Sequence, residues 1–269
     1  MNTPMSPASP ASPAPSVSLV IPMFNERESI EHAIACGVAA LERFGGDYEI
    51  LIVDDASTDG SPEIVLTLAA ANPRIRLLSH AVNRKLGGAL KTGFAAASRD
   101  LVIYIDADLP FDPDVIGPAI RALEVTRADI IAGYRLDRTA EGLRRTIYSY
   151  LYNSLIGLLF GWPHRDINFS FKLLRRQVLE AIELRSEGSL IDAELIVKAK
   201  NLGFVIQQLG LDYFPRSRGV STLSSPAVIF TILRELIALY PEMRHPRRRQ
   251  QAPTPAALAP EPETASQVA

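Results

Sequence analysis

Short apolar runs alternate with amphipathic segments through the first half of the chain. Between the runs, apolar residues recur at the three-to-four spacing of a helix. Buried strands that alternate with helices predict an α/β fold, in which a mostly parallel sheet is covered by helices on both faces. The predicted strands are 18–23, 48–53, 75–78 and 101–105. One predicted helix begins at Ser61-Pro62, a second spans 88–98, and a third begins at Asp112-Pro113.

Composition narrows the class of protein. The chain has 269 residues, of which 47% are apolar and 22% charged, as in a globular protein. Cys36 is the only cysteine, which excludes a disulfide framework and is typical of a reducing, cytoplasmic compartment. The sequence lacks G-x-x-x-x-G-K-[ST], and no G-x-G-x-x-G follows the first strand. Kinase-like, GTPase and dinucleotide-dehydrogenase functions therefore lose their main support.

The net charge of −2 is unevenly distributed between two halves of the chain. Residues 16–133 contain 10 Lys and Arg against 17 Asp and Glu, a balance of −7. Residues 134–250 contain 18 against 11, a balance of +7. An acidic half followed by a basic half predicts one site for a cation and another for an anion.

Asp106 and Asp108 form the central candidate site. They follow the predicted strand 101–105 directly, and residues two apart in extended chain project to the same side. In parallel sheets, ligands bind beyond the carboxyl ends of the strands. Paired carboxylates there favour Mg²⁺ or Mn²⁺, which bridges phosphate oxygens and neutralises a diphosphate leaving group. Taken alone, two aspartates at a loop start also fit solvated side chains or a helix cap.

A second acidic motif, Asp54-Asp55, also follows a strand and is expected at the same edge of the sheet. A carboxylate at this point can accept a hydrogen bond from a base N–H or from a ribose hydroxyl. The residues that follow it, ASTDG, equally fit a turn with Asp and Ser capping. Asn25, at the end of the first strand, could serve simply as a helix cap.

Together these motifs resemble glycosyltransferase family 2, which has the GT-A fold, a Rossmann-like α/β fold with acceptor-side helices at its C-terminal end. The similarity runs through VSLVIPMFNE (17–26), ILIVDDASTDGS (51–61), NRKLGGALKTGF (83–94) and VIYIDADLPFDP (102–113). It implies that the first half binds a nucleotide-sugar and that Asp106 and Asp108 hold the metal. The donor-binding residues that the resemblance implies are Pro22, Phe24, Glu26, Asp54, Asp55, Gly87, Gly88, Lys91 and Asp106. Phe24 stands where the family usually has tyrosine.

The second half resembles the polyprenyl-phosphate subgroup, which includes dolichyl-phosphate mannosyltransferase. Arg145, Ser149 and Asn153 are spaced to lie on one face of a helix, and match R-x-x-x-S-x-x-x-N. Arginines suit phosphate because the guanidinium can grip it bidentately. The resemblance therefore implies an acceptor-phosphate site of Arg135, Arg145, Arg216 and Ser221. Ser170 and Thr222 depart from the residues usual in these relatives, glycine and lysine.

The implied reaction is an inverting transfer of a hexose from GDP-mannose or a UDP-sugar to a polyprenyl phosphate. A phosphate acceptor is already anionic, whereas a hydroxyl acceptor needs a general base, for which Asp192 and Glu194 are the candidates. Either could instead be an ordinary charge at a helix start. Two alternatives are a soluble family 2 enzyme that acts on a glycan or small-molecule hydroxyl, and a catalytically silent nucleotide-binding module. No nucleic-acid partner is expected.

The remaining segments bear on domain limits and membrane contact. Residues 1–15 and 250–269 are rich in Pro and Ala and are expected to be disordered, which leaves 16–243 as one domain with halves 16–133 and 134–243. The uncharged stretch 146–163 fits a packed or interfacial helix better than a crossing one. In the segment 244–269, Arg244 to Arg249 could contact anionic lipid or form a solvated cluster. We therefore expect a cytoplasmic protein with peripheral contact at the inner face of the membrane.

Overall fold

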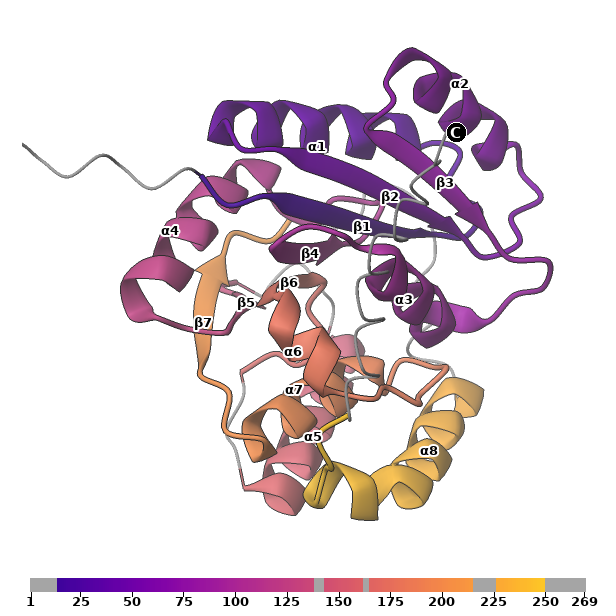
Figure 1. The fold of residues 1–269 in the computed structure, drawn as a ribbon. Helices are drawn as coiled ribbons and strands as arrows, with labels where there is room; N and C mark the ends of the chain where they lie inside the picture. Colours follow the sequence, from indigo (N-terminus) through magenta and orange to yellow (C-terminus); the bar gives the residue numbers. More distant parts are fainter. Residues whose placement is uncertain (1–13, 138–142, 162–164, 215–225, 250–269) are drawn as a thin grey trace, which may run out of the picture.

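The computed structural model describes residues 14–137, 143–161, 165–214 and 226–249. Within these residues, one seven-stranded sheet forms the centre of the molecule, in the order β3-β2-β1-β4-β6-β5-β7 (Figure 1). All neighbouring strands are parallel except β6, which runs antiparallel to both β4 and β5. The strands are β1 (Val17–Met23), β2 (Tyr48–Asp54), β3 (Ile75–Ser79), β4 (Leu101–Ile105), β5 (Ile130–Arg135), β6 (Phe171–Arg175) and β7 (Ile206–Leu211).

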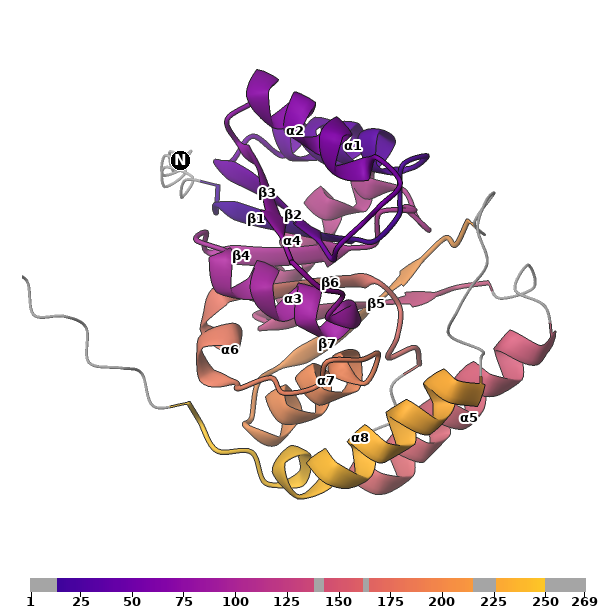
Figure 2. The same cartoon turned by 90° about the vertical axis from the view of Figure 1, so that its right-hand side faces the viewer.

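Helices cover both faces of this sheet, as the sequence predicts (Figures 1 and 2). One face carries α1 (Ile30–Phe44), α2 (Ser61–Ala71), the short 3₁₀ helix η1 (Pro113–Val115) and α4 (Ile116–Thr126). The other face carries α3 (Lys85–Ala96), α6 (Arg176–Ala181) and α7 (Ile191–Asn201). An outer layer of α5 (Leu143–Phe160) and α8 (Pro226–Arg244) shares an apolar cluster with α7.

The first half of the sheet confirms the predicted strands. Strand β1 lies between β2 and β4 and is parallel to both, with Met23 opposite Asp54 and Val20 opposite Tyr104. The carboxyl ends of these strands therefore meet at one edge, which brings the two acidic motifs together. The start of α2 at Ser61 is also confirmed, whereas the helix predicted over 88–98 begins three residues earlier, at Lys85.

Strands β5, β6 and β7 extend the sheet from residue 130 onward, where no strand is predicted from the sequence. In β6, Lys172 is fully buried opposite Tyr104 of β4. A charged residue at the second position of a five-residue strand weakens the apolar pattern from which such a strand is recognised. The structure shows that this strand carries one of the molecule's buried cations.

The predicted domain begins at Ser16 and ends at residue 243, and these limits stay a prediction. Ser16 is anchored, because its backbone N–H and its hydroxyl both donate to Asp100 Oδ2, at 3.1 and 2.7 Å. Residues 1–13 and 250–269, predicted as tails, lie outside the described residues, and the division of 16–243 into two halves stays a prediction. In the described part of the chain, no helix combines the length and apolar character that a membrane crossing needs.

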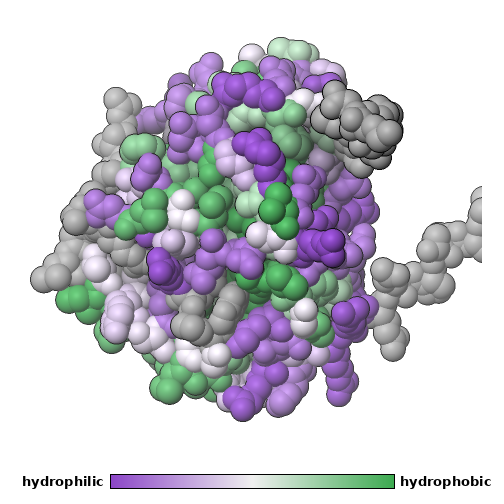
Figure 3. All heavy atoms as spheres, turned by 90° about the vertical axis from the view of Figure 1, so that its left-hand side faces the viewer, coloured by the Kyte–Doolittle hydropathy of each residue, from purple (hydrophilic) through white to green (hydrophobic). Residues whose placement is uncertain are grey.

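The surface is mixed over much of the molecule. Figure 3 shows polar residues spread among apolar ones over the side that lies to the left in Figure 1. On α5 and α8, however, several large apolar side chains are exposed. We call these the α5–α8 apolar surface: Tyr150, Leu151 and Leu158 on α5, and Phe230, Leu233 and Ile237 on α8.

Candidate active site

Two loops at the carboxyl edge of the sheet are fixed to each other. The loop after β1 donates from the backbone N–H of Asn25 to Ser57 Oγ at 2.9 Å, and Asn25 Oδ1 accepts from the N–H of Thr58 at 2.9 Å. Asn25 has a φ of 56°, a left-handed conformation that asparagine tolerates better than most residues. Asn25 therefore links the loop after β1 to the loop after β2, and is not the simple helix cap considered from the sequence.

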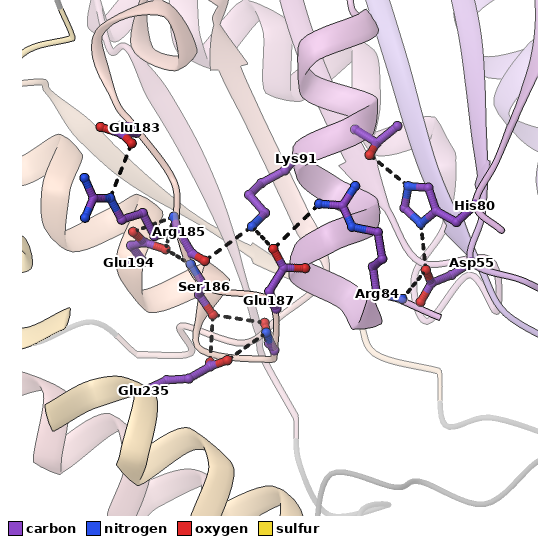
Figure 4. Close-up of polar contacts among 12 residues, drawn as sticks. Asp55, His80, Arg84, Lys91, Glu183, Arg185, Ser186, Glu187, Glu194 and Glu235 are labelled. Carbon is purple, nitrogen blue, oxygen red and sulfur yellow. Dashed lines mark hydrogen bonds and ion pairs between the residues drawn. The ribbon is translucent and has the colours of Figure 1, made fainter. Parts of the chain in front are cut away.

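Asp55 is buried between three elements. Its Oδ1 accepts hydrogen bonds from His80 Nδ1 and from the backbone N–H of Arg84, each at 2.7 Å (Figure 4). The His80 ring in turn lies 2.8 Å from Thr92 Oγ1 through Nε2. Asp54, at the end of β2, accepts from the N–H of Ser57 at 2.9 Å. The turn expected after β2 is thus present, with Asp54 capping it, while Asp55 points into a network with β3 and α3.

Other predicted donor-binding residues surround this network. Phe24 follows β1 directly and is 50% exposed, so its ring offers an open apolar face at the edge of the sheet. Pro22, the penultimate residue of β1, is half-buried. Glu26 is also half-buried, and its carboxylate accepts from Ser29 Oγ at 2.6 Å. Contact of these residues with a base or ribose stays a prediction.

Asp106 and Asp108 follow β4, and both are half-buried. The described residues contain no group of three or more His, Cys, Asp or Glu that could hold a metal. Mg²⁺ and Mn²⁺ do not need such a cage, since they are commonly held by one or two carboxylates together with substrate phosphates and water. Two partly accessible carboxylates at a strand end therefore fit a hard divalent cation.

The segment 183–188 covers the start of α3 (Figure 4). The carbonyl oxygen of Glu187 accepts from the N–H of Gly87 at 2.9 Å, and its carboxylate pairs with Lys91. A Cβ at Gly87 would overlap the carbonyl oxygen of Ser186, and one at Gly88 would meet the Glu187 carboxylate. Close packing of this segment explains Gly87, and the segment together with Arg84 explains Gly88. The assignment of Gly87, Gly88 and Lys91 to a donor pocket stays a prediction.

Asp192, a candidate base, lies in a buried cluster at the start of α7. Its Oδ1 accepts from Tyr104 Oη and is 2.8 Å from Lys172 Nζ. Lys172 also donates to Tyr104 Oη at 3.2 Å and to the carbonyl oxygen of Phe169 at 2.7 Å. Burial, with Asp192 and Asp106 close by, raises the Tyr104 pKa well above its usual value, so this hydroxyl keeps its proton and donates.

Glu194, the other candidate base, is fully buried and bound on both carboxylate oxygens. Oε1 accepts from the N–H of Arg185 at 2.9 Å and from Lys198 Nζ at 2.6 Å. Oε2 accepts from the N–H groups of Arg185 and Ser186, at 3.1 and 2.8 Å. These contacts give Glu194 a structural task, which is to hold the segment 183–188 on α7.

Arg135, predicted to bind an acceptor phosphate, is held at the end of β5. Its guanidinium donates to Asp166 Oδ2 at 2.7 Å and stacks over the rings of Phe169 and Tyr213, 5.1 and 4.9 Å from their centroids. Asp166 is fully buried, so this ion pair fixes the position of the Arg135 guanidinium. The phosphate-binding role of Arg135 stays a prediction.

The predicted helix face in α5 is confirmed in part. Asn153 Nδ2 donates to the carbonyl oxygen of Ser149 at 2.8 Å, and Asn153 Oδ1 accepts from the N–H of Ile167 at 3.0 Å. The backbone of Arg145 lies in the same helix, but its side chain is outside the described part of the chain. Arg216 and Ser221 also lie outside the described residues.

A family model for glycosyl transferase family 2 matches residues 18–183 of the chain. The chain belongs to this family. The match runs from β1 through β6 and ends at the first residue of the segment 183–188, so that it leaves out α7, β7 and α8. It therefore includes both acidic motifs.

Two curated relatives are similar to this family 2 domain in sequence. The chain is 31% identical over 207 residues to glycosyltransferase AglD from Haloferax volcanii, and the aligned region covers 74% of this chain and 33% of the relative. It is 36% identical over 168 residues to the undecaprenyl-phosphate 4-deoxy-4-formamido-L-arabinose transferase of Edwardsiella ictaluri, covering 62% of this chain and 51% of the relative. The chain thus spans between a third and about half of the length of these relatives.

Solved structures confirm the GT-A fold of the domain. Glucosyl-3-phosphoglycerate synthase from Mycobacterium tuberculosis, in complex with Mn²⁺, UDP-glucose and phosphoglyceric acid, superposes with a TM-score of 0.68 at 20% identity. The superposition covers 84% of this chain and 80% of that one. A likeness at this identity establishes the fold alone.

Sequence reasoning missed His80, Lys172 and Asp166 in this family 2 domain. His80 could have been found, because it lies two residues after the end of the predicted strand 75–78, at the same edge of the sheet as Asp55. Lys172 and Asp166 gave no comparable signal, because the antiparallel strand that positions them was not recognised.

Proposed function

We propose that this chain is an inverting glycosyltransferase that moves a hexose from a nucleotide-diphosphate sugar to a polyprenyl phosphate. The observation that carries the proposal is that Asp55 and the pair Asp106 and Asp108 lie at the same edge of the sheet, after the parallel strands β2 and β4 that flank β1. Membership of family 2 supports the reaction class. The names of the undecaprenyl-phosphate transferases support the acceptor class.

The acidic edge of the sheet binds the donor in this proposal. Asp55 accepts a hydrogen bond from the nucleobase, and Phe24 lies against the face of that base. Pro22, Glu26 and Asp54 complete the donor-binding site beside them. Asp106 and Asp108 would hold Mg²⁺ or Mn²⁺, and such an ion, when bound, neutralises the negative charge that develops on the leaving diphosphate. The Mn²⁺ and Mg²⁺ named with UDP in the related folds agree with this donor set.

The acceptor side supplies the nucleophile. An oxygen of the acceptor phosphate forms a bond to the anomeric carbon, while the bond from that carbon to the diphosphate oxygen breaks and its electron pair leaves with the diphosphate. Because the phosphate oxygen is already anionic, no proton has to be removed. Arg135, with Arg145, Arg216 and Ser221, is proposed to orient the phosphate.

The candidate bases give a way to separate this acceptor from a hydroxyl acceptor. Both oxygens of Glu194 are bound within the protein, which leaves Asp192 as the candidate base if the acceptor is a hydroxyl. An Asp192→Asn variant should then keep its rate on a phosphate acceptor and lose roughly 10²–10⁴-fold on a hydroxyl acceptor. Product analysis with a polyprenyl phosphate and with soluble glycans tests both. Transfer to soluble glycans alone would establish the rival, a soluble family 2 enzyme.

The metal-binding edge is tested by the double change Asp106→Ala and Asp108→Ala. We expect sugar transfer to fall by roughly a thousandfold, since metal stabilisation of the leaving group contributes several kcal/mol. The matched control removes two exposed carboxylates near the C-terminal ends of α1 and α4, away from this edge, Glu42→Ala with Glu124→Ala, and should keep its rate. Transfer by the first variant at a near wild-type rate would refute the metal role.

Membrane contact is proposed through the α5–α8 apolar surface. Leu158 and Ile237 are 83% and 78% exposed, and the exposed arginines 247–249 follow α8. Apolar side chains beside basic residues are the pattern of an interfacial helix on an anionic bilayer. An Ile237→Asp change should reduce flotation with anionic vesicles at low salt, while Val125→Asp, at an exposed position on α4, should not. Absence of flotation by the unchanged protein would contradict the proposal.

A further inference from the structure

The carboxylate of Asp55 is bound on one side only. Oδ1 accepts from His80 Nδ1 and from the N–H of Arg84, each at 2.7 Å (Figure 4). A carboxylate oxygen offers about two lone-pair positions, so these two donors fill Oδ1. Among the described residues, every hydrogen bond to this carboxylate goes to Oδ1. Oδ2 is therefore the oxygen through which Asp55 meets a ligand.

Three elements prevent the carboxylate from turning. His80 follows β3 and is nearly buried, with Nε2 2.8 Å from Thr92 Oγ1 on α3. Because a carboxylate can only accept, Nδ1 carries the hydrogen, and in the neutral ring Nε2 accepts from the Thr92 hydroxyl. The main chain of Asp55 is also fixed, since its N–H donates to the carbonyl oxygen of Met23 at 2.8 Å. Oδ1 therefore cannot be offered to a ligand beside Oδ2 without breaking this network.

We propose that His80 makes Asp55 a single hydrogen-bond acceptor, and so selects a base whose edge carries one N–H between two carbonyls. Uracil and thymine have this edge. Guanine presents two adjacent donors, N1–H and the N2 amino group, which need both oxygens of a carboxylate. Cytosine places an unprotonated N3 where the carboxylate needs a donor. The inference rests on the proposed function, which puts a nucleobase at Asp55, and narrows the donor to a uridine or thymidine diphosphate sugar.

Phe24 is placed to bind the face of the base, while Asp55 binds its edge. Its half-exposed ring follows β1, next to the strand that ends at Asp54. Stacking on an aromatic ring is tolerant of the base, because every base has a π-face. Phe24 would supply affinity for any nucleotide, which leaves selectivity to the edge contact at Asp55. His80 is thus a positioning residue for base specificity, not a catalytic one.

The test is a calorimetric titration of the full chain with UDP, dTDP, GDP and CDP in the presence of Mn²⁺. We expect UDP or dTDP to bind at least about tenfold more tightly than GDP and CDP. Guanine would leave one donor without an acceptor, and the N3 lone pair of cytosine would face the carboxylate. Either mismatch should weaken binding by about tenfold. Comparison of UDP with dTDP then separates the uridine from the thymidine donor.

Variants at His80 make the inference specific. His80→Leu should lower the ratio of UDP to GDP affinity by about threefold to tenfold, because Oδ1 loses one of its two donors. His80→Asn keeps an N–H near Nδ1 and should preserve most of the ratio, and Thr92→Val should lower it less than His80→Leu. His32→Leu, at an exposed histidine on α1, is the matched control and should leave the ratio unchanged.

The outcomes separate this inference from the proposed function. If no nucleotide binds the unchanged chain with Mn²⁺, the proposed function fails. If GDP or CDP binds as tightly as UDP and dTDP, or if His80→Leu leaves the ratio where His32→Leu leaves it, the inference is overturned while the proposed function stands. Circular dichroism of each variant confirms that the ratio is measured on folded protein.

Discussion

Two pairs of buried carboxylates in this molecule, Glu49 and Asp55 near the ends of β2 and Asp192 and Glu194 on α7, differ in how their oxygens are bound. On β2, Glu49 lies near the amino end, and Asp55 follows the carboxyl end. On α7, Asp192 and Glu194 are two residues apart in the first turn. In each pair one residue is bound on both oxygens and the other, among the described contacts, on one.

Glu49 shows the fully bound state. Its Oε1 accepts from the hydroxyls of Ser18 and Ser98, at 2.7 and 2.8 Å, and Oε2 accepts from Arg76 at 3.2 Å. Glu194 is bound on both oxygens in the same way, whereas Asp55 and Asp192 accept through Oδ1. A buried carboxylate that the protein satisfies completely serves the fold, and one with an oxygen left over is where a ligand can be recognised.

The largest predicted effect concerns Lys172, the cation that balances Asp192. Lys172→Met should lower the free energy of unfolding by about 3–5 kcal/mol, because it leaves Asp192 buried without its counter-charge. Urea unfolding at pH 7 measures the change. Adding Asp192→Asn should restore a large part of the loss, and Lys85→Met, at an exposed lysine, serves as the control. A loss that Asp192→Asn does not reduce would show that the two charges are not coupled.

The sequence predicts the acidic edge well and its supporting residues poorly. Asp55, Asp106 and Asp108 could be placed because they directly follow apolar runs whose parallel arrangement dictates a common edge. Lys172 could not, because its partner Tyr104 is 68 positions away and they meet only through an antiparallel strand pairing. Alternation of apolar runs and helices specifies parallel neighbours, but it carries no signal for one reversed strand between them.

The choice between Asp192 and Glu194 likewise needed the structure. Both stand in the first turn of α7, where a carboxylate is stabilised by the helix dipole, so the sequence gives them equal standing. They differ because the segment 183–188 folds back over Glu194 and offers it backbone N–H groups. Contacts of this kind depend on where a loop lies in space, which residue types alone do not specify.

Glu194→Gln is the second prediction. The amide cannot accept on both sides, so at least one backbone N–H in the segment 183–188 loses its partner, at a cost of about 1–3 kcal/mol in unfolding free energy. Sugar transfer per folded molecule should stay within about twofold of the unchanged chain, because Glu194 is assigned to the fold. Rates normalised to the folded fraction measure this. A much lower rate in fully folded Glu194→Gln would break the distinction between the two kinds of carboxylate.

The smallest predicted effect tests the fully bound state at the other edge of the sheet. Burial alone would raise the Glu49 pKa, but hydrogen bonds from Ser18, Ser98 and Arg76 outweigh it and hold the pKa below its usual value. The folded state therefore favours the ionised form. This stabilisation is present above the unfolded-state pKa of about 4.3 and is lost as pH falls through the lower folded-state value.

Glu49→Gln should therefore destabilise the protein by about 1–2 kcal/mol at pH 7, as expected for losing charge-assisted hydrogen bonds in a buried site. The difference from the unchanged chain should shrink as pH falls below about 4.3, because both then carry a neutral group there. Urea unfolding at pH 7, 5 and 3.5 measures the trend, and Glu63→Gln, at an exposed position on α2, is the control. A difference that stays constant with pH would show that Glu49 contributes shape and hydrogen bonds but not charge. Its likeness to Glu194 would then be limited to geometry.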